Sequence, residues 1–182
     1  MSDKYSLLFT KEEIKAHTER VGLEIDSWIT EEKNRTGKPV IALCILRGAI
    51  FFFSDLLRSI PQDVQAEFCK LQTYDGNNNP IPDDKLPPIE ISRDLSGHSV
   101  LIVDDICDSG RVLSVLTNHL RNKGVSSIKS AVMVYRDTNR SQFTPDYFAF
   151  KLTSEEWLVG MGFDDNNTFR NLPEIYAIRS KD

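Results

Sequence analysis

The sequence predicts an α/β fold with a mostly parallel sheet and helices on both faces. Apolar runs typical of strands alternate with helix-like segments between residues 40 and 135. The runs Val40–Leu46 and Val100–Val103 are continuously apolar, as expected of parallel strands buried on both faces. A chain of 182 residues, 40% hydrophobic and 27% charged, is long enough for one domain with a sizeable core, so a single domain over 1–182 is expected.

Start and stop signals place the individual elements. Thr10 and Glu13 form a capping box that opens a first helix, which closes over 34–38. Residues 75–88 hold a glycine, three asparagines and four prolines, which predicts a long irregular loop. Further helices are expected over 49–60 and 111–123, and further strands over 64–74, 89–91, 127–135, 147–152 and 158–160.

Charge and composition exclude several classes of protein. A net charge of -5 argues against a nucleic-acid binder that relies on a general basic field. Cys44, Cys69 and Cys107 lack metal-ligand spacing and are expected to be small buried hydrophobes in a reducing compartment. The start of the chain has no signal-peptide pattern, and the longest apolar run is too short to cross a bilayer. A cytoplasmic protein without a membrane partner is therefore expected.

The stretch from Val100 to Leu113 is the most informative part of the sequence. Its apolar run leads into Asp104 and Asp105, and Asp108 and a small-residue turn then open a helix. Ligands of open α/β sheets bind at the carboxyl ends of strands, and backbone N–H groups at a helix start bind anions. Ribose hydroxyls, a divalent cation or both would explain the carboxylates there. A solvated acidic turn that only caps the helix is the alternative.

This stretch resembles the phosphoribosyl pyrophosphate motif of the type I phosphoribosyltransferases, a hydrophobic strand followed by two acidic residues and Asp-Thr/Ser-Gly. The dinucleotide G-x-G-x-x-G and the P-loop patterns, by contrast, are absent. Four further segments resemble the hypoxanthine-guanine branch of that family and occur in the family's order: Leu46-Arg47-Gly48, Thr73-Tyr74, Trp157–Asp164 and Thr168–Leu172.

The resemblance implies a reaction in which a purine base attacks C1 of phosphoribosyl pyrophosphate. A nucleoside monophosphate and pyrophosphate would leave, with IMP or GMP as the product from hypoxanthine or guanine. Asp104 and Asp105 would hold the ribose hydroxyls directly or through Mg²⁺, and Asp108 would act as base or acid at purine N7. The turn that cradles the 5′-phosphate would consist of Ser109, Gly110, Arg111 and Val112.

The same resemblance implies a pyrophosphate site and a lid. Leu46, Arg47, Gly48 and Arg170 would bind the leaving pyrophosphate, and the Leu46–Arg47 peptide is expected to be cis. The lid over residues 73–88, which begins with the catalytic Thr73 and Tyr74, would exclude water. Tyr74 could instead be a plain strand residue, and Arg170 could instead form a surface ion pair.

The base site is where the sequence departs from the family. Trp157 would stack on the purine beside Leu158, unless it is simply a core residue, and Asp164 would serve a second Mg²⁺. Tyr135 stands where the family has the lysine that donates to the purine 6-oxo group, and a phenol can donate as well. Val112 replaces a usual phosphate-binding threonine, so only its backbone N–H remains for the phosphate.

Three functions stay open at this point. The first is transfer to a 6-oxopurine, the second is the same chemistry on another base, and the third is a non-catalytic sensor of phosphoribosyl pyrophosphate. The resemblance further implies a small hood over the base, drawn from the N-terminal segment and about residues 136–182. It also implies a homodimer or homotetramer.

Overall fold

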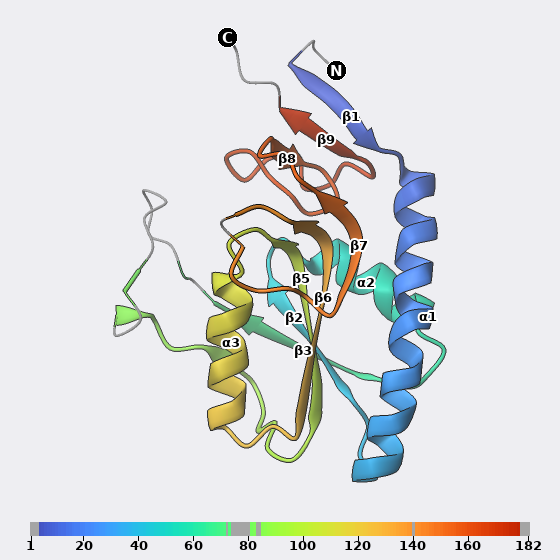
Figure 1. Ribbon diagram of the computed structural model, residues 1–182, viewed down its shortest axis with the longest axis vertical. Helices are drawn as coiled ribbons and strands as arrows, with labels where there is room; N and C mark the ends of the chain where they lie inside the picture. The colour runs from blue at the N-terminus through green and yellow to red at the C-terminus, as the bar shows by residue number, and fades with distance from the viewer. Residues whose placement is uncertain (1–3, 72, 74–80, 83–84, 140, 179–182) are drawn as a thin grey trace.

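The structure is a computed structural model that describes residues 4–71, 73, 81–82, 85–139 and 141–178. Two sheets and three helices make up the described part of the chain (Figure 1). The helices are α1 (Lys11–Thr36), α2 (Ile50–Ser59) and α3 (Arg111–Asn122). The strands are β1 (Tyr5–Phe9), β2 (Ile41–Leu46), β3 (Gln65–Lys70), β4 (Glu90–Ile91), β5 (Ser99–Cys107), β6 (Ser127–Arg136), β7 (Tyr147–Leu152), β8 (Trp157–Val159) and β9 (Ile175–Ile178).

The large sheet confirms the predicted fold class. Its strand order is β4-β3-β2-β5-β6-β7, and every neighbouring pair is parallel except β3 with the short β4. The two continuously apolar runs lie at its centre as β2 and the first half of β5, with Ile41 opposite Val100. Parallel strands must be covered on both faces, which explains why these runs show no polar alternation.

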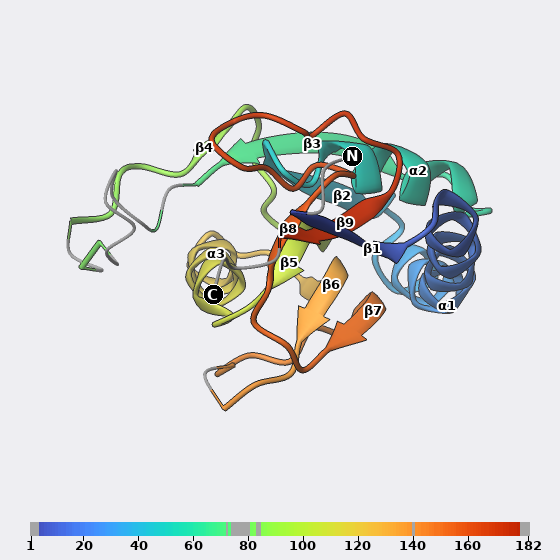
Figure 2. The same ribbon diagram turned by 90° about the horizontal axis from the view of Figure 1, so that it is seen from above.

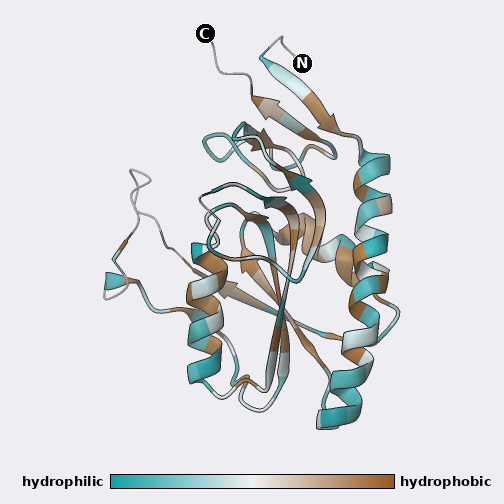
Figure 3. Cartoon of the chain, viewed as in Figure 1, coloured by the Kyte–Doolittle hydropathy of each residue, from teal (hydrophilic) through white to brown (hydrophobic). Residues whose placement is uncertain are grey.

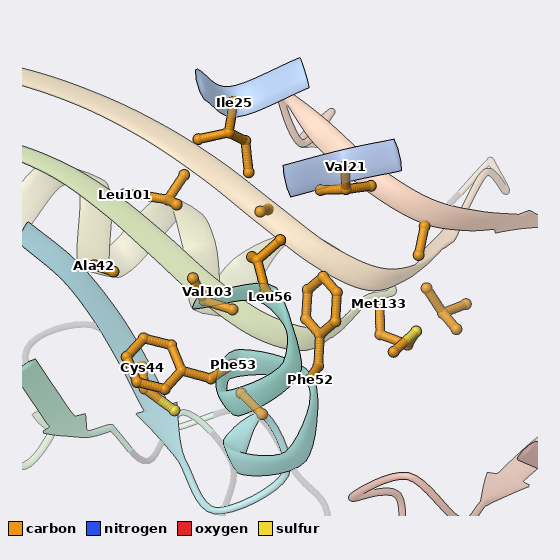
Figure 4. Packing of buried hydrophobic residues seen from close by; sticks show 14 of the residues in the cluster. Val21, Ile25, Ala42, Cys44, Phe52, Phe53, Leu56, Leu101, Val103 and Met133 are labelled. Carbon is orange, nitrogen blue, oxygen red and sulfur yellow. The ribbon is translucent and has the colours of Figure 1, made fainter. Parts of the chain in front are cut away.

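Helices cover both faces of this sheet, as the sequence predicts. The α1 and α2 helices pack on one face, where Val21, Ile25, Phe52 and Leu56 contact residues of the central strands (Figure 4). On the opposite face α3 packs over Val100 and Ile102 and their neighbours, and Figure 2 shows it on the other side of the sheet from α1. The outer surfaces of α1 and α3 are largely hydrophilic (Figure 3).

The first helix begins as predicted. The Thr10 hydroxyl accepts from the Glu13 N–H at 3.2 Å, and the Glu13 carboxylate accepts from the Thr10 N–H at 2.8 Å. The helix ends at Gly37, which adopts a left-handed conformation with φ of 66°. These two caps satisfy backbone groups that a helix end otherwise leaves unpaired, and both can be recognised in the sequence.

A second, three-stranded sheet stands beyond the carboxyl ends of β5, β6 and β7. It has the order β1-β9-β8, so the first and the last described strands lie side by side and antiparallel (Figure 1). Neither β1 nor β9 was expected from the sequence. The β7 strand lies within the 136–182 range expected for the hood but is the edge strand of the large sheet.

The remaining differences from the expected elements are in length. The β3 strand ends at Lys70 rather than near residue 74, and β5 continues to Cys107 rather than ending at Val103.

All three cysteines are free and buried, as expected, and burial raises the pKa of each to about 12. Within the described ranges, no helix has the length and apolar character that crossing a membrane requires.

A buried carboxylate ties the end of α1 to the start of β5. Glu32 accepts from the Ser99 hydroxyl at 2.5 Å and pairs with Arg35, and the hydrogen bond from Arg35 is the main cause that lowers its pKa. We expect Glu32→Gln to lower the free energy of unfolding by about 1.5 kcal/mol at pH 7, because a charge-assisted bond is lost. Urea unfolding measures this difference.

The effect of Glu32→Gln should depend on pH. A carboxyl whose pKa is lowered in the folded state stabilises the protein above its unfolded pKa and loses that contribution as the pH falls. The difference between the two proteins should therefore shrink below about pH 4. Glu19→Gln is the matched control, because Glu19 is exposed and pairs with Lys15 at 3.8 Å, which predicts a loss below about 0.5 kcal/mol. A Glu32→Gln difference that stays constant with pH would contradict this account.

Candidate active site

Five of the residues selected from the sequence line one cavity between the large sheet and the small one: Asp105, Asp108, Trp157, Leu158 and Asp164. The cavity has a volume of about 280 Å³ and lies beyond the carboxyl ends of β5 and β6. Another cavity of about 550 Å³ lies between α1, α2 and the segment after Met161, but none of the predicted site residues lines it. The described residues that line the smaller cavity are Asp105, Ile106, Asp108, Arg136, Trp157, Leu158, Phe163 and Asp164.

The acidic pair is part of β5 itself. Because the strand is longer than expected, Asp104 and Asp105 lie within it, and the Asp104 side chain is buried. Burial, and then the neighbouring Asp105 charge, raises the pKa of Asp104 well above its ordinary value. Burial also raises the pKa of Asp105, while hydrogen bonds and the charge of Arg170 act in the opposite direction. Two adjacent carboxyls in such a setting favour a positively charged ligand.

The loop after β2 lies directly against this pair. The Leu46–Arg47 peptide is cis, as expected. A Cβ atom added to Gly48 would lie 1.8 Å from Asp105 Oδ2, so only glycine allows the loop to approach the carboxylate this closely. A Cβ atom on Gly162, whose φ is 101°, would lie 1.9 Å from the Gly48 carbonyl oxygen. The loops after β2 and β8 are therefore packed backbone to backbone beside the acidic pair.

The loop after β8 brings three predicted residues together. Arg170 Nη2 pairs with Asp164 Oδ1 at 2.5 Å, and Arg170 Nη1 donates to the Gly162 carbonyl at 2.6 Å. The Trp157 indole N–H donates to the Asp164 carbonyl at 2.7 Å. Trp157 is 58% exposed, which excludes the alternative that it is a core residue. Arg47 joins the same loop through a 3.1 Å hydrogen bond to Asn167.

The turn between β5 and α3 has the geometry of an anion site. Gly110 is the N-cap of α3 with φ of 79°, and it provides no side-chain cap for the first turn. The Ser109 hydroxyl accepts from the Arg111 N–H at 3.3 Å. No acidic residue lies in the first turn of α3, so the positive end of the helix dipole remains available for a negatively charged ligand. Val112 is partly buried against the core cluster under this helix.

The predicted lid is described only at its ends. Thr73 is buried, and its carbonyl accepts from the Ile81 N–H at 2.9 Å. The Ile81 carbonyl in turn accepts a hydrogen bond from the Arg111 guanidinium, which links this segment to the start of α3. Tyr74, like the rest of 74–80, lies outside the described residues.

The structure does not bring Tyr135 to the cavity, which corrects the expectation that it contacts the base. Its ring packs in the core cluster under α3, 5.5 Å from the Phe148 ring, and its hydroxyl donates to Asp137 at 3.2 Å. Arg136, which was not expected in the site, lines the cavity instead. In β6 these two successive side chains lie on opposite faces of the sheet, so Arg136 reaches the cavity and Tyr135 does not.

The acidic residues fit a magnesium ion that shares its ligands with a substrate. Among the residues that the structure describes, no group of three or more His, Cys, Asp or Glu side chains could hold a metal by itself. Mg²⁺ commonly takes only one or two carboxylates and completes its shell with phosphate oxygens and water. The adjacent oxygens of Asp104 and Asp105 provide such a donor set, whereas Asp164 is paired with Arg170 in this structure.

Comparison with known proteins supports one family. The sequence model of the phosphoribosyl transferase domain matches residues 12–166. A hypoxanthine-guanine phosphoribosyltransferase of Aquifex aeolicus is 30% identical over 176 residues, which cover 96% of this chain and 95% of that protein. A hypoxanthine-guanine-xanthine phosphoribosyltransferase of Tritrichomonas foetus is 29% identical over 98% of this chain and 94% of its own length.

Solved structures agree with the sequence relatives. A hypoxanthine phosphoribosyltransferase of Staphylococcus aureus superposes with a TM-score of 0.83 at 25% identity, over 96% of this chain and 91% of that one. The family match covers every residue that lines the cavity. The chain therefore belongs to the phosphoribosyltransferase family and groups with its hypoxanthine-guanine phosphoribosyltransferases.

Proposed function

We propose that the protein transfers the 5-phosphoribosyl group of phosphoribosyl pyrophosphate to N9 of a 6-oxopurine, hypoxanthine or guanine, in purine salvage. The bond from N9 to C1 of the sugar forms while the bond from C1 to the pyrophosphate oxygen breaks with its electron pair. The observation that carries the proposal is the meeting of Asp105, Asp108, Trp157 and Asp164 at one cavity, beside the Arg47–Gly48 loop.

The sugar phosphate would lie along β5 and the turn after it. Asp104 and Asp105 would hold the ribose hydroxyls, and the Ser109–Val112 turn, with Gly110 and Arg111, would cradle the 5′-phosphate. This arrangement is supported by the uncapped start of α3, which has no acidic residue in its first turn. The segment from Asp104 to Val112 would therefore fix the sugar while the bond at C1 changes.

The pyrophosphate would lie between the loops after β2 and β8. Leu46, Arg47 and Gly48 would bind it from one side and Arg170 from the other. When bound, Mg²⁺ would neutralise charge that develops on the pyrophosphate oxygens, with Asp104, Asp105 and Asp164 as its protein ligands. Arg170 would then exchange its pairing with Asp164 for contact with the pyrophosphate.

The base would occupy the 280 Å³ cavity. Trp157 would stack on the purine and Leu158, which is buried, would form part of the wall. The Asp108 carboxylate would accept the N7 proton as positive charge moves onto the base. Thr73 and Tyr74, at the start of the predicted lid, would exclude water from the reacting atoms.

We further propose that the enzyme is cytoplasmic and acts as a homodimer or homotetramer. The three cysteines are free and buried, which is typical of proteins in a reducing compartment. Three large apolar side chains on the α2 side of the molecule, Ile50, Phe51 and Phe68, are 40–43% exposed, which is typical of a surface that another subunit covers. No nucleic acid or membrane partner is proposed, given the net charge of -5.

Pyrophosphate release with a panel of bases tests the proposed function. With phosphoribosyl pyrophosphate and Mg²⁺ present, we expect release with hypoxanthine and guanine and much less with adenine. Chelation of Mg²⁺ should reduce the rate by at least tenfold, and added Mg²⁺ should restore it. Reactions without a base provide the control for hydrolysis. Release with adenine alone would contradict the choice of base, and no release with any base would contradict the transferase activity.

A further inference from the structure

A cavity on the α3 side of the large sheet has no part in the proposed reaction. It has a volume of about 360 Å³, which is within the range of sites that bind small organic molecules. Its walls are α3, the first half of β6 and the segment 143–146 before β7. None of the described residues that line this α3 cavity lines the base cavity, so the two are separate.

Four polar side chains of α3 line this cavity. They follow the three- and four-residue spacing that places side chains on one face of a helix. They are Ser114, Thr117, Asn118 and Arg121. Within the described part of the chain, none of the four side chains has a hydrogen-bond or ion-pair partner. One face of α3 therefore presents two hydroxyls, an amide and a guanidinium to the cavity, all able to donate to a ligand.

The hydroxyl of Thr117 is the strongest sign that this face binds something. The residue is only 6% exposed, and its Oγ1 atom is buried without a hydrogen-bond partner among the described residues. Buried polar groups are rarely left unpaired, because the lost contact with water is not replaced. A ligand oxygen in the cavity would supply the missing partner.

The charges around the cavity favour an anion. Asp146 is the one carboxylate among its described lining residues, and both of its oxygens are engaged. Oδ1 accepts from Lys129 at 2.6 Å, and Oδ2 accepts from the Ser130 N–H at 2.9 Å and from the Ser130 hydroxyl at 3.1 Å. Asp146 and Lys129 neutralise each other, which leaves the positive charge of Arg121 without a counterion.

The shape of the donor set favours a phosphate group with an organic body. A phosphomonoester offers three strong acceptor oxygens, whereas a carboxylate offers two, so it can satisfy more of the four donors of α3. Ile128 and Phe143 line the same cavity and provide an apolar surface that an organic body would cover.

The segment before β7 connects this cavity to the turn proposed to cradle the 5′-phosphate. A Cβ atom added to Gly110 would lie 2.3 Å from Phe143 Cβ, so the segment packs directly against the turn. The Gln142 N–H donates to the Ser109 carbonyl at 3.1 Å. Residues 141–145 form neither helix nor strand, so these contacts and a ligand in the cavity would help to fix their position.

We propose that the α3 cavity binds a small phosphomonoester and that its occupation strengthens the binding of phosphoribosyl pyrophosphate. A ligand against Phe143 would hold the segment that supports Gly110, and a turn already held in its binding conformation binds more tightly. By linkage, each ligand strengthens the other by the same factor. The coupling rests on the proposed function, whereas binding in the α3 cavity does not.

Phenyl phosphate is the probe for binding, because it is a phosphomonoester with an apolar body. Nuclear magnetic resonance follows the backbone amide signals of Asn118, Lys129 and Thr144 during a titration. We expect saturable shifts in wild type and a Kd about 10- to 100-fold higher in Arg121→Gln, because a charge-assisted bond is lost. Benzoate, with two oxygens and a smaller charge, should bind wild type about tenfold more weakly than phenyl phosphate.

Two further variants make the binding test specific. Thr117→Val keeps the shape of the side chain and removes its hydroxyl, so the Kd should rise by about 3- to 10-fold. Arg58→Gln is the matched control, because Arg58 is exposed on α2 and pairs with Asp55, and its Kd should equal that of wild type. Near-ultraviolet circular dichroism checks that each variant is folded. Absence of binding in wild type, or an unchanged Kd in both folded Arg121→Gln and Thr117→Val, overturns the site, and equally tight binding of benzoate overturns its phosphate chemistry.

Calorimetry of phosphoribosyl pyrophosphate with Mg²⁺, with and without phenyl phosphate, tests the coupling. We expect phenyl phosphate to lower the Kd of wild type by about fivefold and to leave that of Arg121→Gln unchanged. A Kd that rises in both proteins indicates competition at the turn and, like an unchanged Kd in wild type, overturns the coupling. Phosphoribosyl pyrophosphate that does not bind wild type at all contradicts the proposed function, and the titration of phenyl phosphate still decides whether the α3 cavity is a site.

Discussion

Replacing Asp108 by asparagine is expected to lower kcat with hypoxanthine by about 10²- to 10⁴-fold, the usual contribution of a general acid or base. Asparagine has the same shape but does not accept the N7 proton as a carboxylate does. The Asp108 side chain lines the base cavity, and its Oδ1 atom lies 4.0 Å from Arg136 Nε. These neighbours position the carboxylate without any contribution from the lid. Steady-state kinetics of pyrophosphate release measure the effect.

The split between kinetic parameters shows whether Asp108 acts in the reaction. A group that acts in the transition state lowers kcat and kcat/KM together, whereas a group that only binds the base raises KM. Asp55→Asn is the matched control, because Asp55 pairs with Arg58 at the surface of α2 and does not line the cavity. Wild-type kcat in a folded Asp108→Asn enzyme would contradict the proposed chemistry.

The second large effect is expected for Gly48→Ala. The new methyl group would lie 1.8 Å from Asp105 Oδ2, so either the carboxylate or the loop after β2 must move. Both take part in the proposed binding of the sugar and the pyrophosphate. A displacement on the order of 1 Å in such a site can reduce the rate by about 100-fold. We therefore expect kcat/KM for phosphoribosyl pyrophosphate to fall by about that factor.

Gly37→Ala provides the control for Gly48→Ala. An added Cβ at Gly37 meets nothing within 4 Å, although its φ of 66° makes alanine unfavourable there. Gly37→Ala should therefore lower stability by about 1 kcal/mol without changing the kinetics of the folded enzyme. Near-normal kinetics in Gly48→Ala would show that the loop accommodates a side chain and that its contact with Asp105 is not needed.

Local signals in the sequence account for much of the fold. The capping box at Thr10 and Glu13 forms within one helical turn. The continuously apolar runs of β2 and β5 must be buried on both faces of a sheet, whatever the rest of the fold is. The acidic residues that follow such a run are brought to the ligand-binding edge by the parallel arrangement alone. For this reason Asp105 and Asp108 could be placed in the site from the sequence.

The parts that the sequence did not predict depend on contacts between distant segments. The strands β1 and β9 pair Tyr5 with Ile178, and neither strand has a pattern that signals this partner. The choice between Tyr135 and Arg136 depends on which face of β6 meets the small sheet. The family resemblance favoured Tyr135, but only the packing of its ring against Phe148 shows that the side chain turns away from the cavity.

The most direct measurement is quantification of both products from hypoxanthine and phosphoribosyl pyrophosphate by chromatography. If the cavity at the ends of β5 and β6 transfers the phosphoribosyl group to a 6-oxopurine, IMP and pyrophosphate should form in equal amounts, with guanine giving GMP in the same way. Pyrophosphate formed without nucleotide, or nucleotide formed only from adenine, would contradict this assignment.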